Sequence, residues 1–353
     1  MVERKFLEID GSFGEGGGSI LRLSGGFSVL FNRPIRIRNI RANRPNPGLQ
    51  EQHLLGIKTL SELTDSTLSD CKIGTTELTM IPGNKVKNEI HVNVGTAAMI
   101  GLLLQPVQIA CLGFNSPEKI EISLKGGGTF GEWAPSLNYL KEVTYPIFAK
   151  AGYKISVEIE KHGFYPKGGA STKCVIYPPK NKLKPINLTE LGNIDLIRGE
   201  IIVTEHLRQG NVSERIKKSI IQEFKRNLDI EIDIRYIWVN SLSPGVGLSL
   251  WAQSDTGAII SSGTVLGEKR ISSEKLGAIA ANELVNYIRN GIPVDNYLSD
   301  QLIPLMAYIK EPSRIKVLEV TSHARTNLNL IKLFTKRNYA IIKEKNYFFI
   351  EYQ

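Results

Sequence analysis

Residues 10–18 read Asp-Gly-Ser-Phe-Gly-Glu-Gly-Gly-Gly, and both the fold and the function are inferred outward from this stretch. A short strand-like run at 6–9 precedes it, and an apolar segment of helix length follows at 20–31. Glycines between a strand and a helix let backbone N–H groups approach a phosphate closely. The carboxylate of Glu15 in such a loop suits a divalent metal that accompanies phosphates. A tight turn with an acidic helix start has the same sequence features, so the loop alone leaves both interpretations open.

The composition is typical of a globular protein with a basic surface. The 353 residues are enough for two domains, or for one large domain with an insertion. A net charge of +9 fits a polyanionic partner, although a generic basic surface gives the same charge. Cys71, Cys111 and Cys174 are far apart in the sequence, which argues against a disulfide framework and against a zinc site.

The sequence shows no sign of secretion or of membrane insertion. The first residues contain no apolar segment of the kind found in a secretory signal. Residues 97–114 form the most apolar run, but glutamines and a proline interrupt it, so we expect a buried helix there. We therefore expect a cytoplasmic protein with no membrane partner.

One layout recurs along the chain: small residues, then an apolar stretch of helix length, then a short strand. It occurs at 16–40, 95–124, 135–159 and 324–352, and the last of these ends in two strands joined by a hairpin turn. Recurring units of this kind predict tandem βα modules packed around shared sheets.

The sequence between 186 and 275 differs from these units and predicts a small inserted α/β domain. Apolar residues at helical spacing predict an amphipathic helix over 212–228, with Ser213 as its N-cap. Alternating apolar and charged residues at 230–235 predict a half-buried strand. We expect the helix over 273–288 to re-enter the main domain.

His323 has the strongest local reason of any histidine for a chemical role. It follows an expected strand, and Thr321 and Ser322 are natural N-caps for the next helix. A histidine in the first helical turn feels the positive end of the helix dipole, so we expect a neutral, nucleophilic ring near pH 7. The same helix end attracts a phosphate. The alternative is a capping segment whose histidine has no chemical role, whereas His91 and His206 are expected to be exposed surface residues.

Two further polar segments, 40–53 and 295–301, also suit a nucleotide or an RNA end. Arg41 and Arg44 lie in a loop rich in Pro and Gly, and guanidinium groups bind terminal phosphates in a bidentate manner. In the second segment Tyr297 can stack on a purine, and polar groups follow it at a helix start. A solvated basic loop and an ordinary capping sequence are the alternatives for these two segments.

Gln105 interrupts an apolar helix, and a buried amide needs hydrogen-bond partners. A nucleotide base or ribose would satisfy the amide, and a backbone carbonyl would do so equally well. The sequence contains no P-loop, kinase or G-x-S-x-G motif, and Ser19 stands where the dinucleotide-binding fingerprint over 14–19 requires glycine. These common nucleotide-binding and hydrolase classes are therefore excluded.

Taken together, these residues resemble the RNA 3′-terminal phosphate cyclase family almost from end to end. Six ordered motifs carry the resemblance, at 10–22, 41–53, 162–169, 267–270, 297–301 and 323–327. The resemblance implies an α+β fold, with a large domain of three repeated βαβαββ-type units and a small inserted α/β domain. The large domain is then discontinuous, over 1–185 and 276–353, and the inserted domain covers 186–275.

The resemblance also implies the activity and its residues. The family converts a 3′-phosphate end of RNA to a 2′,3′-cyclic phosphate with ATP and a divalent metal, Mg²⁺ or Mn²⁺. A histidine is adenylated, and His323 lies at that position, while Glu15 lies where an acid contacts the metal. The positions matching the ATP site are Gln105, Pro135, Tyr297, Leu298, Ser299, Asp300 and Gln301. The positions matching the RNA terminus or its phosphate are Arg22, Arg41, Arg44, Gln52 and His53.

Two alternatives of similar architecture remain at this point. One branch of the family lacks the nucleophilic histidine and serves ribosome assembly, and His323 favours the catalytic branch instead. An enolpyruvyl-transferase would share the repeated units but would not react with ATP. The expected partner is an RNA with a 3′-phosphate end, and the sequence does not choose between a monomer and a homodimer.

Overall fold

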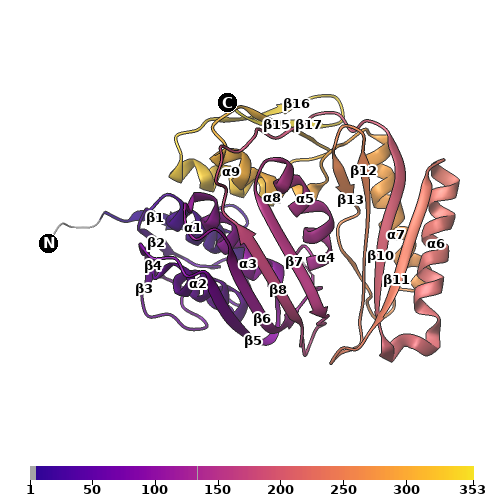
Figure 1. Ribbon diagram of the computed structural model, residues 1–353, viewed down its shortest axis with the longest axis horizontal. Coiled ribbons are helices and arrows are strands. Elements are labelled where there is room, and N and C mark those ends of the chain that lie inside the picture. Colours follow the sequence, from indigo (N-terminus) through magenta and orange to yellow (C-terminus); the bar gives the residue numbers. More distant parts are fainter. Residues whose placement is uncertain (1–4, 133) are drawn as a thin grey trace.

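The computed structural model describes residues 5–132 and 134–353. Within these residues the strands form four mixed sheets with helices packed against them, so the predicted α+β class is confirmed (Figure 1). In Figure 1 the first sheet lies at the left, the second in the middle and the third across the top. A sheet covered by α6 and α7 forms the right-hand end of the molecule.

The first sheet has the strand order β1-β2-β4-β3. β1 and β2 are parallel because α1 crosses between them, and the remaining pairs are antiparallel. Isoleucines of β1 and β2 pair in register, Ile9 opposite Ile37, and both are buried. The elements are β1 (Leu7–Asp10), α1 (Gly18–Leu30), β2 (Ile35–Arg38), α2 (Glu51–Thr64), β3 (Thr67–Leu68) and β4 (Leu78–Ile81).

The second sheet has the order β5-β6-β8-β7, with β5 parallel to β6 and the other pairs antiparallel. The helix expected from residue 95 begins only at Ile100, because residues up to Met99 continue β5, where Met99 pairs with Gly128. The strands are β5 (Glu89–Met99), β6 (Ile120–Gly128), β7 (Lys154–Lys161) and β8 (Ser171–Tyr177). The helices are α3 (Ile100–Ala110), the 3-10 turn η1 (Cys111–Gly113), α4 (Leu137–Tyr139), the π-helical turn η2 (Leu140–Thr144) and α5 (Tyr145–Lys150).

The third sheet combines one early strand with the C-terminal part of the chain. Its order is β16-β17-β15-β9, with β9 parallel to β15 and the other pairs antiparallel. The predicted C-terminal hairpin is confirmed as β16 and β17. The elements are β9 (Asn187–Leu188), α8 (Asn296–Tyr308), β15 (Ser313–Val317), α9 (Ser322–Phe334), β16 (Tyr339–Lys343) and β17 (Phe348–Tyr352).

The chain between β9 and α8 forms the remaining sheet, of order β11-β10-β12-β13 with β14 paired to β12. β10 and β11 are parallel because α6 connects them, and β10 and β12 are antiparallel. The strands are β10 (Ile194–Thr204), β11 (Glu231–Val239), β12 (Val246–Ser254), β13 (Ile259–Ser261) and β14 (Val265–Leu266). The helices are the 3-10 turn η3 (Glu205–Gly210), α6 (Val212–Asn227) and α7 (Ser273–Arg289).

The amphipathic helix predicted here is confirmed as α6, whose Ile216, Ile220 and Phe224 are fully buried. The predicted N-cap at Ser213 is wrong, because Asn211 caps the helix in a left-handed conformation and Ser213 is buried inside the first turn. The helix expected over 273–288 is present as α7 (Ser273–Arg289). This helix, α7, packs on α6 and on the sheet of β12, β13 and β14.

Helix packing brings the segments of interest together. α1 packs against α2, α3 and α9, and α9 packs against α8, so the starts of α1 and α9 meet. Every residue of α3 is buried, as expected for an apolar helix inside the protein. Among the described residues, no helix combines the length and apolar character needed to cross a bilayer.

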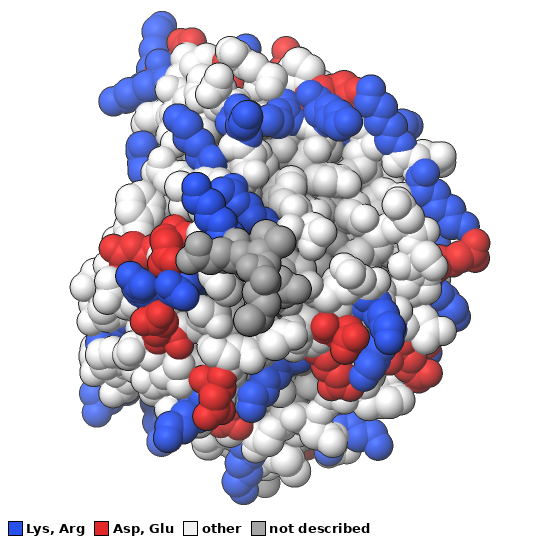
Figure 2. All heavy atoms as spheres, turned by 90° about the vertical axis from the view of Figure 1, so that its left-hand side faces the viewer, with Lys and Arg blue, Asp and Glu red and all other residues white. Residues whose placement is uncertain are grey.

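Figure 2 shows the side of the molecule that carries the first sheet, where basic and acidic side chains lie next to one another. Arg36 and Arg38 pair there with Glu8 and Glu77 at N–O distances of 3.3 to 3.7 Å. Such exposed pairs contribute little to stability, and they reduce the net charge of this face.

Candidate active site

His323 and Glu15 are in direct contact, although they come from opposite ends of the chain. His323 lies in the first turn of α9, whose N-cap is Thr321, and Thr321 Oγ1 accepts a hydrogen bond from Ala324 N at 2.9 Å. Nδ1 of His323 contacts Oε1 of Glu15 as an ion pair. The Glu15 side chain is only 14% exposed, whereas that of His323 is 47% exposed. Because Nδ1 faces the carboxylate, Nε2 is the ring nitrogen left for a ligand.

The shift in the pKa of His323 runs opposite to the direction expected from the helix dipole. The contact with Glu15 raises the pKa of His323 above its usual value of 6.5, against the opposing effect of burial. The helix N-terminus is therefore not the dominant influence on this ring. A carboxylate that holds the Nδ1 proton fixes the tautomer and the orientation of the ring, and a neutral ring then carries its lone pair on Nε2.

The glycine-rich loop of residues 10–18 packs directly on the helix that carries His323. Gly14 has a φ of +59°, and a Cβ there would lie 2.4 Å from Thr326 Oγ1, so only glycine fits. The Ser12 carbonyl of the loop accepts a hydrogen bond from Asn43 Nδ2 at 3.2 Å. α1 starts after Gly17 without a side-chain cap, which leaves its first backbone N–H groups available to an anion.

Arg22 is a buried cation in the second turn of α1. Arg22 is only 8% exposed, and its Nε donates a hydrogen bond to Gln105 Oε1 at 2.9 Å. Burial lowers the pKa of Arg22 to about 10. Within the described residues no carboxylate lies at ion-pair distance from it, although Glu15 is near enough to favour its charged form. A buried guanidinium without an ion-pair partner favours an anionic ligand.

His53 and Arg44 lie around the same loop. His53 is buried, and its Nδ1 accepts from Gln50 N at 3.2 Å, while burial and the charge of Arg22 lower the pKa of His53 to about 3. A Cβ on Gly18 would lie 2.0 Å from His53 Nε2, so the imidazole packs on the start of α1. Arg44 Nη2 lies 3.8 Å from Glu15 Oε2, and the Arg44 side chain is 41% exposed.

The other two residues predicted at the RNA terminus are placed differently. Arg41 has a φ of +54°, and its Nη1 donates to the carbonyl oxygens of Asn46 and Gly48. Its guanidinium thus braces its own loop. Gln52 lies half-buried in the first turn of α2, next to His53.

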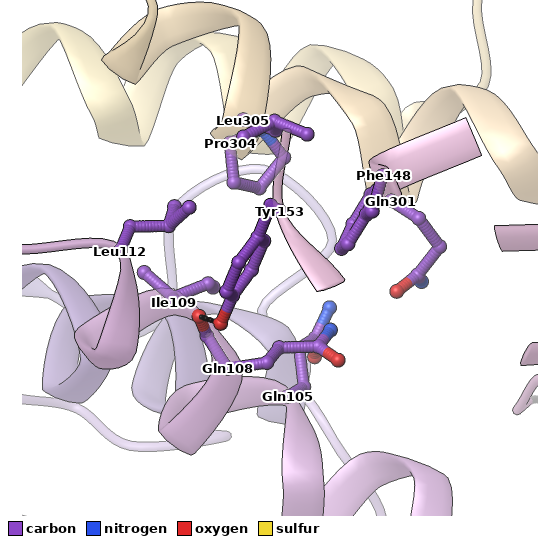
Figure 3. Close-up of a pocket in the computed structure, with 9 residues that line it drawn as sticks. All are labelled: Gln105, Gln108, Ile109, Leu112, Phe148, Tyr153, Gln301, Pro304 and Leu305. Carbon is purple, nitrogen blue, oxygen red and sulfur yellow. Dashed lines mark hydrogen bonds between the residues drawn. The ribbon is translucent and has the colours of Figure 1, made fainter. Parts of the chain in front are cut away.

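Gln105 and Gln301 come from different helices and line one small cavity between α3, α5 and α8. Figure 3 shows both amides directed into this space, beside Tyr153, whose hydroxyl donates to the Gln108 carbonyl. The interior volume of about 10 Å³ suits a single water molecule. The hydrogen-bond partner of the buried Gln105 amide is Arg22, which the sequence did not suggest.

Some of the remaining residues predicted at the ATP site lie near His323, and others do not. Asp300 Oδ1 accepts from Thr321 Oγ1 at 3.0 Å, and burial raises the pKa of Asp300 to about 7. Tyr297 is 45% exposed. Leu298 and Ser299 are fully buried, and the Ser299 hydroxyl donates to the Asn296 carbonyl, so their side chains do not join the others.

Pro135 lies against the first turn of α3. Its carbonyl oxygen is 2.8 Å from where a Cβ on Gly101 would be, one helical turn before Gln105. This close approach places the loop before α4 against the helix that carries Gln105.

The carboxylate of Glu15 suits a metal ion that a bound ligand also coordinates. No cluster of three or more His, Cys, Asp or Glu side chains occurs in residues 5–132 and 134–353. Oε1 of Glu15 is buried against His323 Nδ1, and Oε2 lies 3.8 Å from Arg44 Nη2, beyond hydrogen-bond distance. A single carboxylate of this kind fits Mg²⁺ or Mn²⁺ when substrate phosphates supply the other ligands.

Sequence reasoning gave no role to two residues of the 323–327 motif that lie beside His323. Thr326 packs on Gly14, and Asn327 Nδ2 donates to the Asp300 carbonyl at 3.4 Å. Asn327 Oδ1 is buried without a hydrogen-bond partner among the described residues. Both residues follow His323 by three and four positions in α9, and this helical spacing is the signal that would have found them.

A carboxylate-bound imidazole, a buried guanidinium and a helix start without a side-chain cap lie around one loop, and this combination suits a protein that acts on phosphates. Residues 13–341 match the protein family described as RNA 3′-terminal phosphate cyclase. The chain therefore belongs to the RNA 3′-terminal phosphate cyclase family.

Curated relatives agree with this assignment. The chain is 37% identical to the RNA 3′-terminal phosphate cyclase of Methanopyrus kandleri, over 93% of both chains. It is 36% identical to the protein of that name from Thermococcus kodakarensis, over 94% of this chain and 93% of the relative. For the protein of that name from Methanothermobacter thermautotrophicus the identity is 35%, over 96% and 97% of the two chains.

Proposed function

We propose that this protein is an ATP-dependent RNA 3′-terminal phosphate cyclase. It converts a 3′-phosphate end of RNA to a 2′,3′-cyclic phosphate and releases AMP and pyrophosphate. Membership of the family over nearly the whole chain supports this reaction. The observation that best supports the reaction at the level of residues is the contact of Glu15 with His323 Nδ1, because this contact leaves Nε2 for the ligand.

In the first step, Nε2 of His323 attacks the α-phosphorus of ATP. A P–N bond forms, the bond to the bridging oxygen breaks and pyrophosphate leaves. The ring must be neutral to attack. Because Nδ1–H donates to the Glu15 carboxylate, the proton stays on Nδ1 and the free lone pair is on Nε2. The buried guanidinium of Arg22 and the first N–H groups of α1 bind the phosphates. A divalent metal held by Glu15 would neutralise charge on these phosphates when bound.

In the second step, an oxygen of the RNA 3′-phosphate attacks the adenylate phosphorus. The P–N bond breaks, and the product is an RNA-(3′)pp(5′)A end. The neighbouring 2′-hydroxyl then attacks the RNA phosphorus, expels AMP and closes the ring. This last step is intramolecular, and correct positioning can supply an effective molarity of ~10⁵ M. Arg44 is placed to hold the RNA phosphate, since it is exposed and 3.8 Å from Glu15.

We also propose that three copies of one βαβαββ unit build the large domain. The sheets β1-β2-β4-β3, β5-β6-β8-β7 and β9-β15-β17-β16 share one strand order and one pattern of parallel and antiparallel pairs, which supports this proposal. The inserted domain then interrupts the third copy after β9. Because α7 packs on α6, we count α7 with the inserted domain, whose end moves from residue 275 to 289.

Covalent labelling tests the proposed function. Incubation with ATP labelled in its α-phosphate and with Mg²⁺ should leave an acid-labile label on the protein, as expected for a phosphoramidate. His323→Ala should abolish the label, whereas His91→Ala, which changes an exposed histidine of β5, should keep it. A label that persists in His323→Ala would refute the assignment of the nucleophile, and an unlabelled wild-type protein would refute the cyclase reaction.

A further inference from the structure

Asp295 joins three separate segments of the chain through one buried carboxylate. It is the N-cap of α8 and is fully buried. Its Oδ1 accepts from Tyr297 N at 3.0 Å, from Leu298 N at 2.9 Å and from the Tyr139 hydroxyl at 2.8 Å. Its Oδ2 accepts from Ser261 N at 3.0 Å.

The three segments come from different parts of the fold. Tyr139 ends α4, in the loop-and-helix segment that starts at Pro135. Ser261 ends β13 of the sheet covered by α6 and α7. A second link joins these two segments directly, because Ser136 N donates to Thr264 Oγ1 at 3.1 Å and Thr264 Oγ1 donates to Ser136 Oγ at 2.9 Å. The end of β13 is thus bound both to α8 and to the segment after Pro135.

These links fix the ring of Tyr297. Gly263 has a φ of +70°, and a Cβ there would lie 2.2 Å from Tyr297 Cε2, so the ring lies against the bare backbone of residue 263. The Tyr139 ring meets the Tyr297 ring edge to face, with 6.1 Å between centroids. Tyr297 is nevertheless 45% exposed. A rigid aromatic ring with a free surface is a platform on which a planar base can stack.

We propose that Asp295 is a positioning residue for the adenine-binding platform of Tyr297, and that residues 261–264 of the β13 segment complete this site. The inference deepens the proposed function, on which it rests, since the ligand is the adenosine part of ATP. The inserted domain then helps to bind adenosine, although its residues are far from His323 in the sequence. It also explains why residue 263 is glycine, because any side chain would displace the Tyr297 ring.

The carboxylate form of Asp295 is the one that the hydrogen bonds require. All four of its partners are donors, and the Tyr139 hydroxyl needs an acceptor in a buried place. Burial raises the pKa of Asp295 to about 6, so the residue is mainly ionised at neutral pH. Breaking one of these bonds leaves a buried donor unpaired and loosens the segment that it comes from.

Equilibrium binding tests the inference without the chemical step. The full-length His323→Ala protein cannot form the adenylate, so calorimetry on it reports binding alone. On this background Gly263→Ala and Tyr139→Phe should each weaken ATP and AMP binding about tenfold or more, the size expected for losing one well-placed contact. Binding of inorganic tripolyphosphate should not change, because the phosphates bind at α1 and Arg22. With His323 intact, Tyr139→Phe should raise the KM for ATP and leave kcat nearly unchanged.

Matched controls separate positioning from general damage. Gly152→Ala changes another glycine with positive φ, with its nearest neighbour at 3.6 Å, and Tyr339→Phe removes another tyrosine hydrogen bond; both should bind ATP normally. ATP binding that is equal in Gly263→Ala, Tyr139→Phe and the background overturns the inference while the proposed function stands. Equal losses for ATP and tripolyphosphate also overturn it, since they indicate a general disturbance. Absence of any ATP binding to the background protein contradicts both proposals.

Discussion

Arg22 Nε donates a hydrogen bond to Gln105 Oε1 across 2.9 Å, and this bond joins α1 to α3 inside the protein. It satisfies one donor of a buried guanidinium, whose Nη1 lies 2.9 Å from where a Cβ on Gly18 would be, at the start of α1. Arg22, which we propose binds phosphate, and Gln105, which matches the ATP site of the family, are therefore one structural unit. Gln105 can influence phosphate binding without touching the nucleotide.

Replacing Gln105 with Met or with Glu separates its effect on stability from its effect on phosphate binding. Gln105→Met keeps the size of the side chain but leaves Arg22 Nε buried without an acceptor, which should lower the free energy of unfolding by about 1–3 kcal/mol. Gln105→Glu keeps the acceptor and adds a negative charge beside Arg22, so stability should be retained while the affinity for ATP and inorganic phosphate falls. Urea unfolding and calorimetry on the same preparations measure both effects. Two variants with equal phosphate affinity would show that the charge of Arg22 does not bind the ligand.

The pair of Glu15 and His323 predicts a pH dependence of nucleophile reactivity. Because Glu15 raises the pKa of His323, the protonated and unreactive ring persists above the usual pKa of 6.5. The rate of self-adenylation should rise with pH as this proton is lost. Glu15→Gln removes the carboxylate and should move the titration of His323 to lower pH. NMR titration of the imidazole in the metal-free protein follows this directly, and an unchanged midpoint in Glu15→Gln would show that the contact does not control the ring.

Two neutral histidines, the buried His53 and the half-buried His162, predict a loss of stability in acid. Burial lowers the pKa of His53 to about 3 and that of His162 to about 4, whereas an unfolded histidine titrates near 6.5. Between these values the unfolded chain binds protons that the folded chain does not, so stability is full above pH 6.5 and falls as the pH drops toward 4. Each histidine contributes a slope of about 1.4 kcal/mol per pH unit in that window.

Urea unfolding at several pH values between 4 and 7 checks this slope. His53→Gln should reduce it, and His91→Gln should not, since His91 lies exposed on β5. An identical pH dependence in wild type and His53→Gln would mean that His53 is protonated in the folded protein as well.

Local sequence signals predicted the elements that local contacts determine. The C-terminal hairpin depends on a turn between two adjacent strands, and α6 depends on apolar residues at helical spacing, so both follow from the sequence. The start of α3 was misplaced because the pairing of Met99 with Gly128 on a distant strand extends β5. Tertiary pairing decided between strand and helix there, and no local pattern carries that information.

The electrostatics of the candidate site could not be predicted from the sequence. The motifs identified His323 and Glu15 separately, but only the packing of the glycine-rich loop on α9 brings them into contact. That contact raises the pKa of His323, whereas the helix dipole alone would lower it. A capping sequence was the alternative left open for 295–301, and Asp295 is the N-cap of α8, but its bond to Ser261 depends on the chain between β9 and α8 folding back onto α8.

Arg44 and Arg41 differ in what their guanidinium groups contact, and this predicts different effects of losing them. Arg44 is exposed and lies 3.8 Å from Glu15, beside the site where an RNA phosphate would meet the adenylate. Arg44→Ala should therefore slow cyclisation of an RNA 3′-phosphate by a larger factor than it slows self-adenylation. Arg41 donates to the Asn46 and Gly48 carbonyls, so Arg41→Ala should loosen the whole loop and slow both steps together.

Single-turnover kinetics separates the two steps in each variant. One experiment follows label transfer from ATP to the protein, and the other follows its transfer from the isolated adenylate to a short RNA with a 3′-phosphate. Arg44→Lys serves as the matched control, because it keeps the charge and loses the bidentate geometry. Recovery of the second step in Arg44→Lys would indicate that charge is sufficient, while equal losses of both steps in Arg44→Ala would place Arg44 at the phosphates of ATP instead.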